Sequence, residues 1–248
     1  MDKYFVVGEN IGDSLLPFIF RHMFKAYGIL AEYIPVEKDT ANFPAFIKEF
    51  QENRFTGIHI EGKFRAMTRH LLEDGIASQS VGFLYYADGK YHAINKDSST
   101  MYFIVKNKKL YGGEGKRALV LGDSNDAYDI AVKGLIDYDT VVVGKSDPID
   151  YSKEYEIVVK ATEDPEILNK LEFSLIKNVK FAVDTIYSTV DSNFIKQAEY
   201  RKIEAINGLR FFASWVAKSL EYMSGHNDSY SVVDYVYNIL EEVTNFNK

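Results

Sequence analysis

The sequence predicts an α/β protein built from two domains. In the second half of the chain, short Val-rich strands alternate with helical segments, which is typical of a doubly wound parallel sheet. In the first half, two alternating runs flank an Asp88-Gly89 pair, which indicates a β-hairpin. The length of 248 residues also favours more than one domain. We expect an α/β domain over residues 1–110 with 225–248, and a Rossmann-like domain over 111–224.

The N-terminal domain is expected to open with a strand over residues 3–7, which Gly8 ends. A helix should follow up to Gly28, because apolar residues recur there at helical spacing, and Ser14 is its expected N-cap. The other elements expected before the hairpin are strands over 31–36 and 56–60 and helices over 43–50 and 66–72.

The hairpin strands are expected over residues 82–86 and 91–94, whereas residues 98–110 fit a helix and a strand equally well. A glycine-rich joint follows, formed by Gly112, Gly113 and Gly115. Beyond it we expect strands over 117–121, 140–143, 156–159 and 180–183, and helices over 127–135, 165–171, 209–223 and 231–243.

The composition excludes several classes of protein. The net charge of −7 gives no reason to expect a nucleic-acid partner, and no apolar run reaches the roughly 18 residues that span a membrane. The absence of cysteine excludes disulfides and thiolate metal sites, and the five histidines lack paired-ligand spacing, so we expect no metal. The chain starts as a strand and not as a signal peptide, so we expect a cytoplasmic protein.

Short motifs occur along the chain in a fixed order. They are Ile-Gly-Asp-Ser-Leu-Leu-Pro over 11–17, Gly-Ile-His-Ile-Glu-Gly-Lys-Phe-Arg over 57–65, Asp88-Gly89-Lys90, Asn95-Lys96-Asp97, Leu-Val-Leu-Gly over 119–122, Ala161-Thr162, Asp184 with Tyr187, and Asn207-Gly208-Leu209 continuing to Glu221 and Gly225. In this order and spacing they resemble the shikimate dehydrogenase family over nearly the whole chain.

The resemblance implies a fold and a reaction. The N-terminal domain would bind a small-molecule substrate, and the Rossmann-like domain would bind NADP. The family reduces 3-dehydroshikimate to shikimate with NADPH, in aromatic amino acid biosynthesis, and a Lys–Asp pair handles the alcohol proton. We expect a monomer or a homodimer.

The catalytic residues implied by the resemblance are altered in part. Arg65 stands where the family has its catalytic Lys, and Lys63 stands where the family has Pro. A guanidinium, with a pKa above roughly 12, cannot readily exchange a proton, although it can hold a carboxylate or polarise a carbonyl. Asp97 matches the catalytic Asp. The alternatives are that Lys63 and Arg65 are solvated turn residues and that Asp97 caps a turn.

The substrate-binding residues implied by the resemblance are also altered. Ser14 matches the first of two hydroxyls that hold the substrate carboxylate, but Leu16 replaces the second. His59 replaces an Asn and Glu61 replaces a Thr. A carboxylate at Glu61 is unfavourable beside an anionic substrate unless Lys63 or Arg65 pairs with it.

Two aromatic residues stand where the family has amides that bind substrate. Phe83 replaces an Asn and Trp215 replaces a Gln. Such a site suits a flatter or more apolar ligand. The alternative is that both rings fill an abandoned pocket.

The expected cofactor loop keeps Gly122 but loses the later glycines of the family pattern. Ser124 and Asn125 occupy the loop, whereas the acidic residues Asp123 and Asp126 would repel phosphate. The expected site for the 2′-phosphate of NADP is a pair from the next loop, Lys145 and Ser146. The alternative there is a solvated loop with one lysine.

These residues lead to one function and two alternatives. The first is a shikimate dehydrogenase-like oxidoreductase that reduces 3-dehydroshikimate or a related cyclic keto acid with NADPH. The second is a relative that binds a small ligand or partner without redox chemistry. The third is an oxidoreductase that acts on a different, more apolar substrate.

Overall fold

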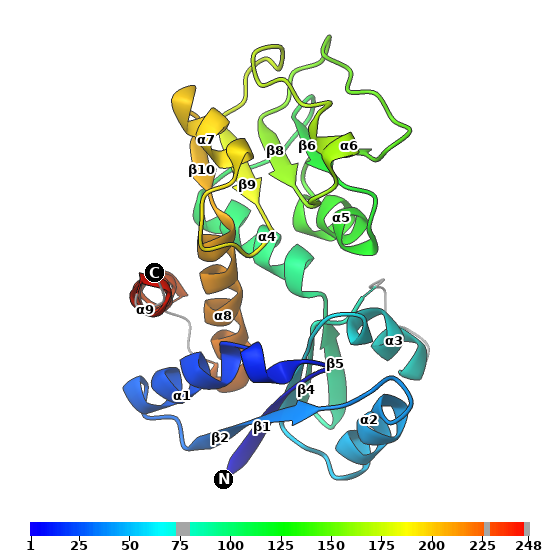
Figure 1. Ribbon diagram of the computed structural model, residues 1–248, viewed down its shortest axis with the longest axis vertical. Helices are drawn as coiled ribbons and strands as arrows, with labels where there is room; N and C mark the ends of the chain where they lie inside the picture. Colours follow the sequence, from blue (N-terminus) through cyan, green and yellow to red (C-terminus); the bar gives the residue numbers. More distant parts are fainter. Residues whose placement is uncertain (73–79, 226–228, 246–248) are drawn as a thin grey trace. The chain divides into compact units, whose positions relative to one another are not determined.

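The computed structural model describes residues 1–72, 80–225 and 229–245, and its contacts divide the chain into two compact units. The first unit comprises Met1–Lys96 with Ser219–Asn227, and the second comprises Asp97–Lys218 with Asp228–Lys248. Each unit contains a five-stranded sheet (Figure 1). The borders of these two units differ from those of the expected domains. The expected domain borders stay a prediction.

The sheet of the first unit is mixed. Its strands are β1 (Asp2–Gly8), β2 (Ala31–Glu37), β3 (Gly57–Ile60), β4 (Phe83–Ala87) and β5 (Lys90–Ile94), in the order β2-β1-β3-β4-β5. β1 pairs in parallel with β2 and β3, whereas β3, β4 and β5 pair antiparallel. The predicted hairpin is confirmed, because Asp88 and Gly89 both have positive φ, as a tight two-residue turn between twisted strands requires.

Helices cover both faces of this sheet (Figure 1). Phe5 and Val7 of β1 pack on one face with α2 (Phe43–Glu52) and α3 (Phe64–Leu71). The intervening residue Tyr4 packs on the other face against Phe24 of α1 (Leu16–Ala26). The alternation along β1 thus produces a three-layer unit with an aromatic core.

The sheet of the second unit is entirely parallel. Its strands are β6 (Arg117–Leu121), β7 (Asp139–Val143), β8 (Ile157–Lys160), β9 (Phe181–Asp184) and β10 (Glu204–Ile206), in the order β10-β9-β8-β6-β7. The chain therefore reverses its direction of travel across the sheet between β6 and β8. Open α/β sheets bind ligands outside the carboxyl ends of the strands at such a switch point.

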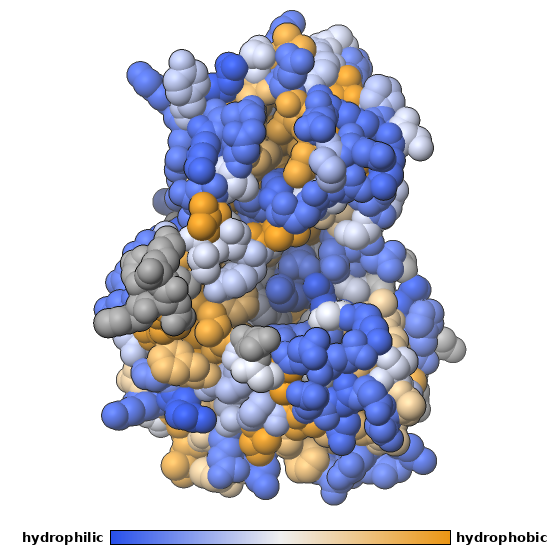
Figure 2. Space-filling model, viewed as in Figure 1, coloured by the Kyte–Doolittle hydropathy of each residue, from blue (hydrophilic) through white to orange (hydrophobic). Residues whose placement is uncertain are grey.

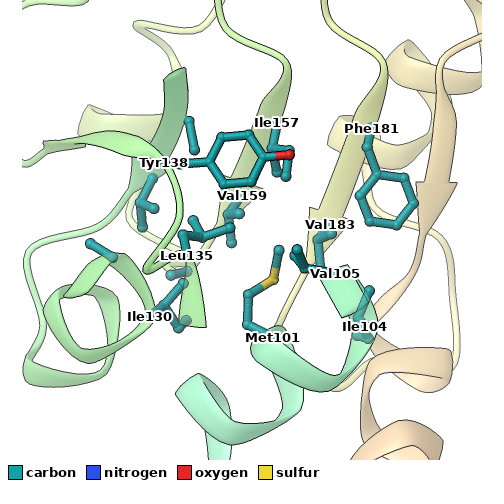
Figure 3. Packing of buried hydrophobic residues seen from close by; sticks show 14 of the residues in the cluster. Met101, Ile104, Val105, Ile130, Leu135, Tyr138, Ile157, Val159, Phe181 and Val183 are labelled. Atoms are coloured by element: carbon teal, nitrogen blue, oxygen red, sulfur yellow. The ribbon is translucent and has the colours of Figure 1, made fainter. Parts of the chain in front are cut away.

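Two hydrophobic clusters sandwich the parallel sheet. Ala118 and Val120 of β6 belong to the cluster of Figure 3, which includes Met101 of α4 (Lys96–Asn107). Leu119 and Leu121 point to the other cluster.

The remaining elements are α5 (Asn125–Asp129), the π-helical turn η2 (Ile130–Gly134), α6 (Pro165–Leu168), α7 (Asn193–Tyr200), α8 (Gly208–Ser224) and α9 (Ser229–Asn245). The predicted doubly wound fold is confirmed.

Some local predictions differ from the structure. The ambiguous segment 98–110 is helical as α4, and the sequence patterns missed α7 and β10. The helix expected over 165–171 ends as α6 at Leu168, because Lys170 and Leu171 make short-range hydrogen bonds to carbonyls three residues earlier.

Hydrophilic residues dominate the molecular face drawn in Figure 2. Within the described ranges, no helix is long and apolar enough to cross a bilayer.

Gly57 is expected to tolerate no side chain. A methyl group there would lie 2.9 Å from the ring of Tyr4 and 3.1 Å from that of Phe83. Gly57→Ala should therefore lower the free energy of unfolding by about 1–3 kcal/mol, measured by urea denaturation with circular dichroism. The control is Gly12→Ala, because no atom lies within 4 Å of a methyl group there. Equal effects of the two substitutions would contradict this packing argument.

Candidate functional site

Ser14 and Glu61 meet at the carboxyl ends of β1 and β3. The Ser14 hydroxyl donates a hydrogen bond to Oε1 of Glu61 over 3.0 Å. The expected N-cap role of Ser14 is displaced by one residue, because Leu15 directly precedes α1, but the Ser14 hydroxyl still accepts a hydrogen bond from the N–H of Leu16, the first residue of that helix, over 3.4 Å. Ser14 also ends the 3₁₀ turn η1 (Ile11–Asp13), where its N–H donates to the Ile11 carbonyl. Its side chain is thereby directed to Glu61.

Glu61 is a partly buried carboxylate held at this end of the sheet. Its backbone N–H donates to the Val7 carbonyl over 3.0 Å, which continues the register of β1 and β3 by one residue. Burial raises the pKa of Glu61, and the Ser14 hydrogen bond and the charge of Lys96 counteract that rise. The motif around Asn95 and Asp97 includes Lys96, but the sequence analysis assigned this lysine no role.

Lys63 and Arg65 point to different partners. β3 ends at Ile60, and Gly62 turns the chain with a positive φ of 58° before α3 begins. Lys63 Nζ then pairs with Oε1 of Glu9 at 2.7 Å, and half of the Lys63 side chain is exposed. Arg65 Nη2 lies 3.5 Å from the Ser80 hydroxyl. Their expected catalytic roles stay predictions.

His59 lies in the core of the first unit. Its Nδ1 lies 2.6 Å from the Tyr33 hydroxyl and its Nε2 lies 3.0 Å from the Ser219 hydroxyl. Only 1% of the residue is exposed, and this desolvation holds its pKa well below 6.5. The imidazole is therefore neutral and hydrogen-bonded through both nitrogens.

Phe83 and Trp215 are both buried in their own units. Phe83 stacks on the His59 ring, with the centroids 4.4 Å apart, and it continues into a stack with Tyr85 and Tyr222. Trp215 lies in the part of α8 that belongs to the second unit, and 1% of it is exposed. The substrate-binding roles expected for Phe83 and Trp215 stay predictions.

Asp97 lies in the first turn of α4, and 7% of it is exposed. An acidic side chain is favourable there, because the amino end of a helix carries partial positive charge. By its contacts Asp97 belongs to the second unit, while its neighbour Lys96 belongs to the first. Asp97 directly follows Lys96 in the sequence, and the charge of Lys96 lowers the pKa of Glu61.

Gly122 marks the switch point of the parallel sheet. A side chain there would lie 3.0 Å from the Ala161 carbonyl oxygen and 3.1 Å from Cβ of Ala127, and its φ is 152°. Ser124 caps α5, since its hydroxyl accepts a hydrogen bond from the Ala127 N–H. Asn125 is exposed at the start of the same short helix.

Lys145 and Ser146 lie exposed in the loop after β7. Lys145 pairs with Asp164 at 2.8 Å, and this hydrogen bond raises the pKa of Lys145. The ammonium of Lys170 donates to the carbonyls of Gly144 and Asp147 over 2.7 and 2.8 Å, which ties this loop down. A phosphate at Lys145 would have to compete with Asp164.

Sequence reasoning missed Lys160, a buried cation at the carboxyl end of β8. Lys160 is 2% exposed and pairs across the sheet with Asp184, 3.1 Å away, as well as with Glu163. Asp184 also accepts a hydrogen bond from the Ser192 hydroxyl over 2.6 Å. A lysine that ends a Val-rich buried strand is the signal that identifies such a residue.

Among the residues that the structure describes, no group of three or more acidic or histidine side chains is placed to hold a metal ion.

Comparison with known proteins identifies similar sequences and structures. Residues 6–68 match the family model described as the shikimate dehydrogenase substrate binding domain. The shikimate dehydrogenase (NADP(+)) of Chromobacterium violaceum is 24% identical over 259 aligned residues, which cover 90% of this chain and 93% of that protein.

Two solved structures have a similar fold. Shikimate 5-dehydrogenase from Thermus thermophilus, in complex with NADP(H) and shikimate, is 18% identical with a TM-score of 0.76, over 96% of this chain and 99% of that chain. The ligand-free 5-ketofructose reductase of a Gluconobacter species is 17% identical with a TM-score of 0.78, over 96% of this chain and 98% of that chain.

The buried His59 should make stability depend on pH. The unfolded chain protonates this residue below about pH 6.5, whereas the folded chain resists protonation, so the unfolded state binds more protons there. Stability should therefore fall as the pH decreases below about 6.5, by up to about 1.4 kcal/mol per pH unit. His59→Gln should remove this part of the slope in urea titrations at several pH values. A variant at the exposed His22 is the control, and parallel slopes for His59→Gln and wild type would refute the argument.

The ion pair of Lys160 and Asp184 should be sensitive to loss of one partner. Lys160→Met leaves a buried carboxylate, a change that typically costs about 3–5 kcal/mol. We expect the lower end, because Asp184 keeps the Ser192 hydroxyl and the Ile186 N–H as donors. Adding Asp184→Asn should restore part of the loss, measured as unfolding midpoints. A double variant less stable than Lys160→Met would count against a stranded charge.

Proposed function

Because the chain belongs to the shikimate dehydrogenase family, at low identity to its members, we propose that it is a nicotinamide-dependent oxidoreductase. It would interconvert a ketone and an alcohol on a small hydroxylated ring. The observation that carries this proposal is the match of the Chromobacterium violaceum enzyme along 90% of the chain. The parallel sheet with a glycine at its switch point supports it.

The cofactor site of this proposal lies at the carboxyl ends of β6 and β7. Gly122 supports a dinucleotide site, because Ala161 and Ala127 pack so closely against it that the turn after β6 requires glycine, as the tight strand-to-helix turn of such sites does. Ser124 and Asn125 would contact the pyrophosphate, and Lys145 and Ser146 would receive a 2′-phosphate once Asp164 gives way. NADP is therefore the proposed cofactor, in line with the relatives named for it. When bound, the nicotinamide supplies the hydride.

The chain's own residues would orient the carbonyl and handle the proton. Arg65 can polarise a carbonyl oxygen but cannot readily deliver a proton. Lys63 has a primary ammonium that can do so once it leaves Glu9. Asp97 would supply a carboxylate that takes part in the proton transfer.

The substrate is proposed from the relatives and from the fold. The Thermus thermophilus structure contains shikimate, so 3-dehydroshikimate or a related cyclic keto acid is the first compound to test. The fold also serves a reductase named for 5-ketofructose, which is a neutral sugar. A cytoplasmic location and a monomeric or homodimeric state complete the proposal.

A second candidate is a relative that binds a ligand without redox chemistry. Two observations favour it. The loop after β6 carries Asp123, whose exposed carboxylate would repel a pyrophosphate. The Lys145 ammonium, expected to receive phosphate, is already paired with Asp164.

Titration with NADPH separates the two candidates. The oxidoreductase should bind NADPH at micromolar concentration and oxidise it with shikimate-like ketones or neutral hydroxylated ketones, followed by nicotinamide absorbance. Asp97→Asn should lower kcat by about 10²–10⁴-fold while the melting temperature stays near that of wild type. Unchanged turnover of Asp97→Asn rejects the proposed role of Asp97. No binding of NADPH at millimolar concentration rejects the oxidoreductase and favours the second candidate.

A further inference from the structure

The carboxyl ends of β1 and β3 hold two acidic side chains with different surroundings. Glu9, just after β1, is paired with Lys63 at 2.7 Å and is well exposed. Glu61, just after β3, is less exposed and accepts the Ser14 hydroxyl over 3.0 Å. The carboxylate of Glu9 is thus neutralised by its ion pair, whereas that of Glu61 faces a neutral hydroxyl.

The nearby cations leave the charge of Glu61 in place. Lys63 is committed to Glu9, and Arg65 is directed to Ser80. Lys96 acts on Glu61 electrostatically, but its effect on the pKa of Glu61 is smaller than that of burial. A second carboxylate beside Ser14 would therefore meet the like charge of Glu61, and the ammonium of Lys63 is already paired with Glu9.

Glu61 also has hydrogen-bonding capacity to spare. A carboxylate accepts about four hydrogen bonds, and Ser14 supplies one of them. A ligand hydroxyl is a suitable further donor, because a bond to an ionised acceptor is shorter and roughly twice as strong as a neutral one. This end of the sheet suits an O–H donor and opposes an anion.

We propose that Glu61 sets the substrate class of this protein, so that the site takes a neutral hydroxylated ketone or alcohol and rejects the corresponding carboxylic acid. This inference rests on the proposed function. The carboxylate of Glu61 holds the Ser14 hydroxyl that a substrate carboxylate would otherwise engage.

The size of the discrimination follows from electrostatics. Two unit charges about 4 Å apart near a protein surface repel by an energy that corresponds to about a thousandfold in binding constant. Solvent and Lys96 reduce this effect, so we expect at least about tenfold.

The test compares shikimate with its methyl ester, which has the same ring and no charge. Calorimetry on the full chain should show the ester binding at least about tenfold more tightly than the acid. Glu61→Gln keeps an acceptor for Ser14 and removes the charge, so it should raise the affinity for shikimate by at least about tenfold. Glu52→Gln, at an exposed residue of α2 in the same unit, is the matched control and should behave as wild type.

The outcomes separate this inference from the proposed function. Wild type that binds the acid as tightly as the ester, an unchanged Glu61→Gln, or no binding of either compound each overturn the inference. The comparison of the two compounds on wild type needs no variant, so it stands even where Glu61→Gln fails to fold. NADPH binding is measured separately. If the protein binds NADPH and prefers the acid, the proposed function stands and only this inference is rejected. If it prefers the ester but does not bind NADPH, the effect of Glu61 on the ligand stands and the oxidoreductase is rejected.

Discussion

The first unit depends on a segment that arrives from far along the chain. Its sheet is built before residue 96, yet the segment that begins at Ser219 belongs to it. Two hydrogen bonds tie that segment to the sheet: Tyr4 donates to the Met223 carbonyl over 2.9 Å, and His59 bonds to the Ser219 hydroxyl. The aromatic stack of Phe83, Tyr85 and Tyr222 adds apolar contact to the same junction. The first unit is therefore complete only after the entire parallel sheet has been synthesised, because all five strands of that sheet precede Ser219 in the sequence.

Three charged residues of the candidate site are each engaged by another residue of the same unit. Glu61 has Ser14, Lys63 has Glu9, and Lys145 has Asp164. These pairs connect positions where the sequence departs from the family it resembles to residues that lie nearby in the fold. The charges of Lys63 and Lys145 are thus balanced by nearby carboxylates, whereas Glu61 has a neutral hydroxyl as its hydrogen-bond partner.

Much of the fold was predictable from sequence because local chemistry determined it. Asp88-Gly89 required a two-residue turn, and the Val-rich runs could only be buried strands. The site was predictable only in part, because partners distant in sequence decide what a side chain does. Ser14 is a good N-cap by residue type, but its hydroxyl also donates a hydrogen bond to Glu61, which lies 47 residues away in the sequence. His59 stands at a position expected to bind substrate, but its two ring nitrogens are hydrogen-bonded to the hydroxyls of Tyr33 and Ser219. Lys160 finds Asp184 through strand register, which only the folded sheet reveals.

Helix α8 passes from one compact unit to the other between Lys218 and Ser219. Trp215, the chain's single tryptophan, is buried one turn before that point. Its indole emission therefore comes from one known position against a background of 18 tyrosines. The helix that both units share thus carries an intrinsic fluorophore. The wavelength and the quenching of its emission report how this helix responds when either unit binds a ligand.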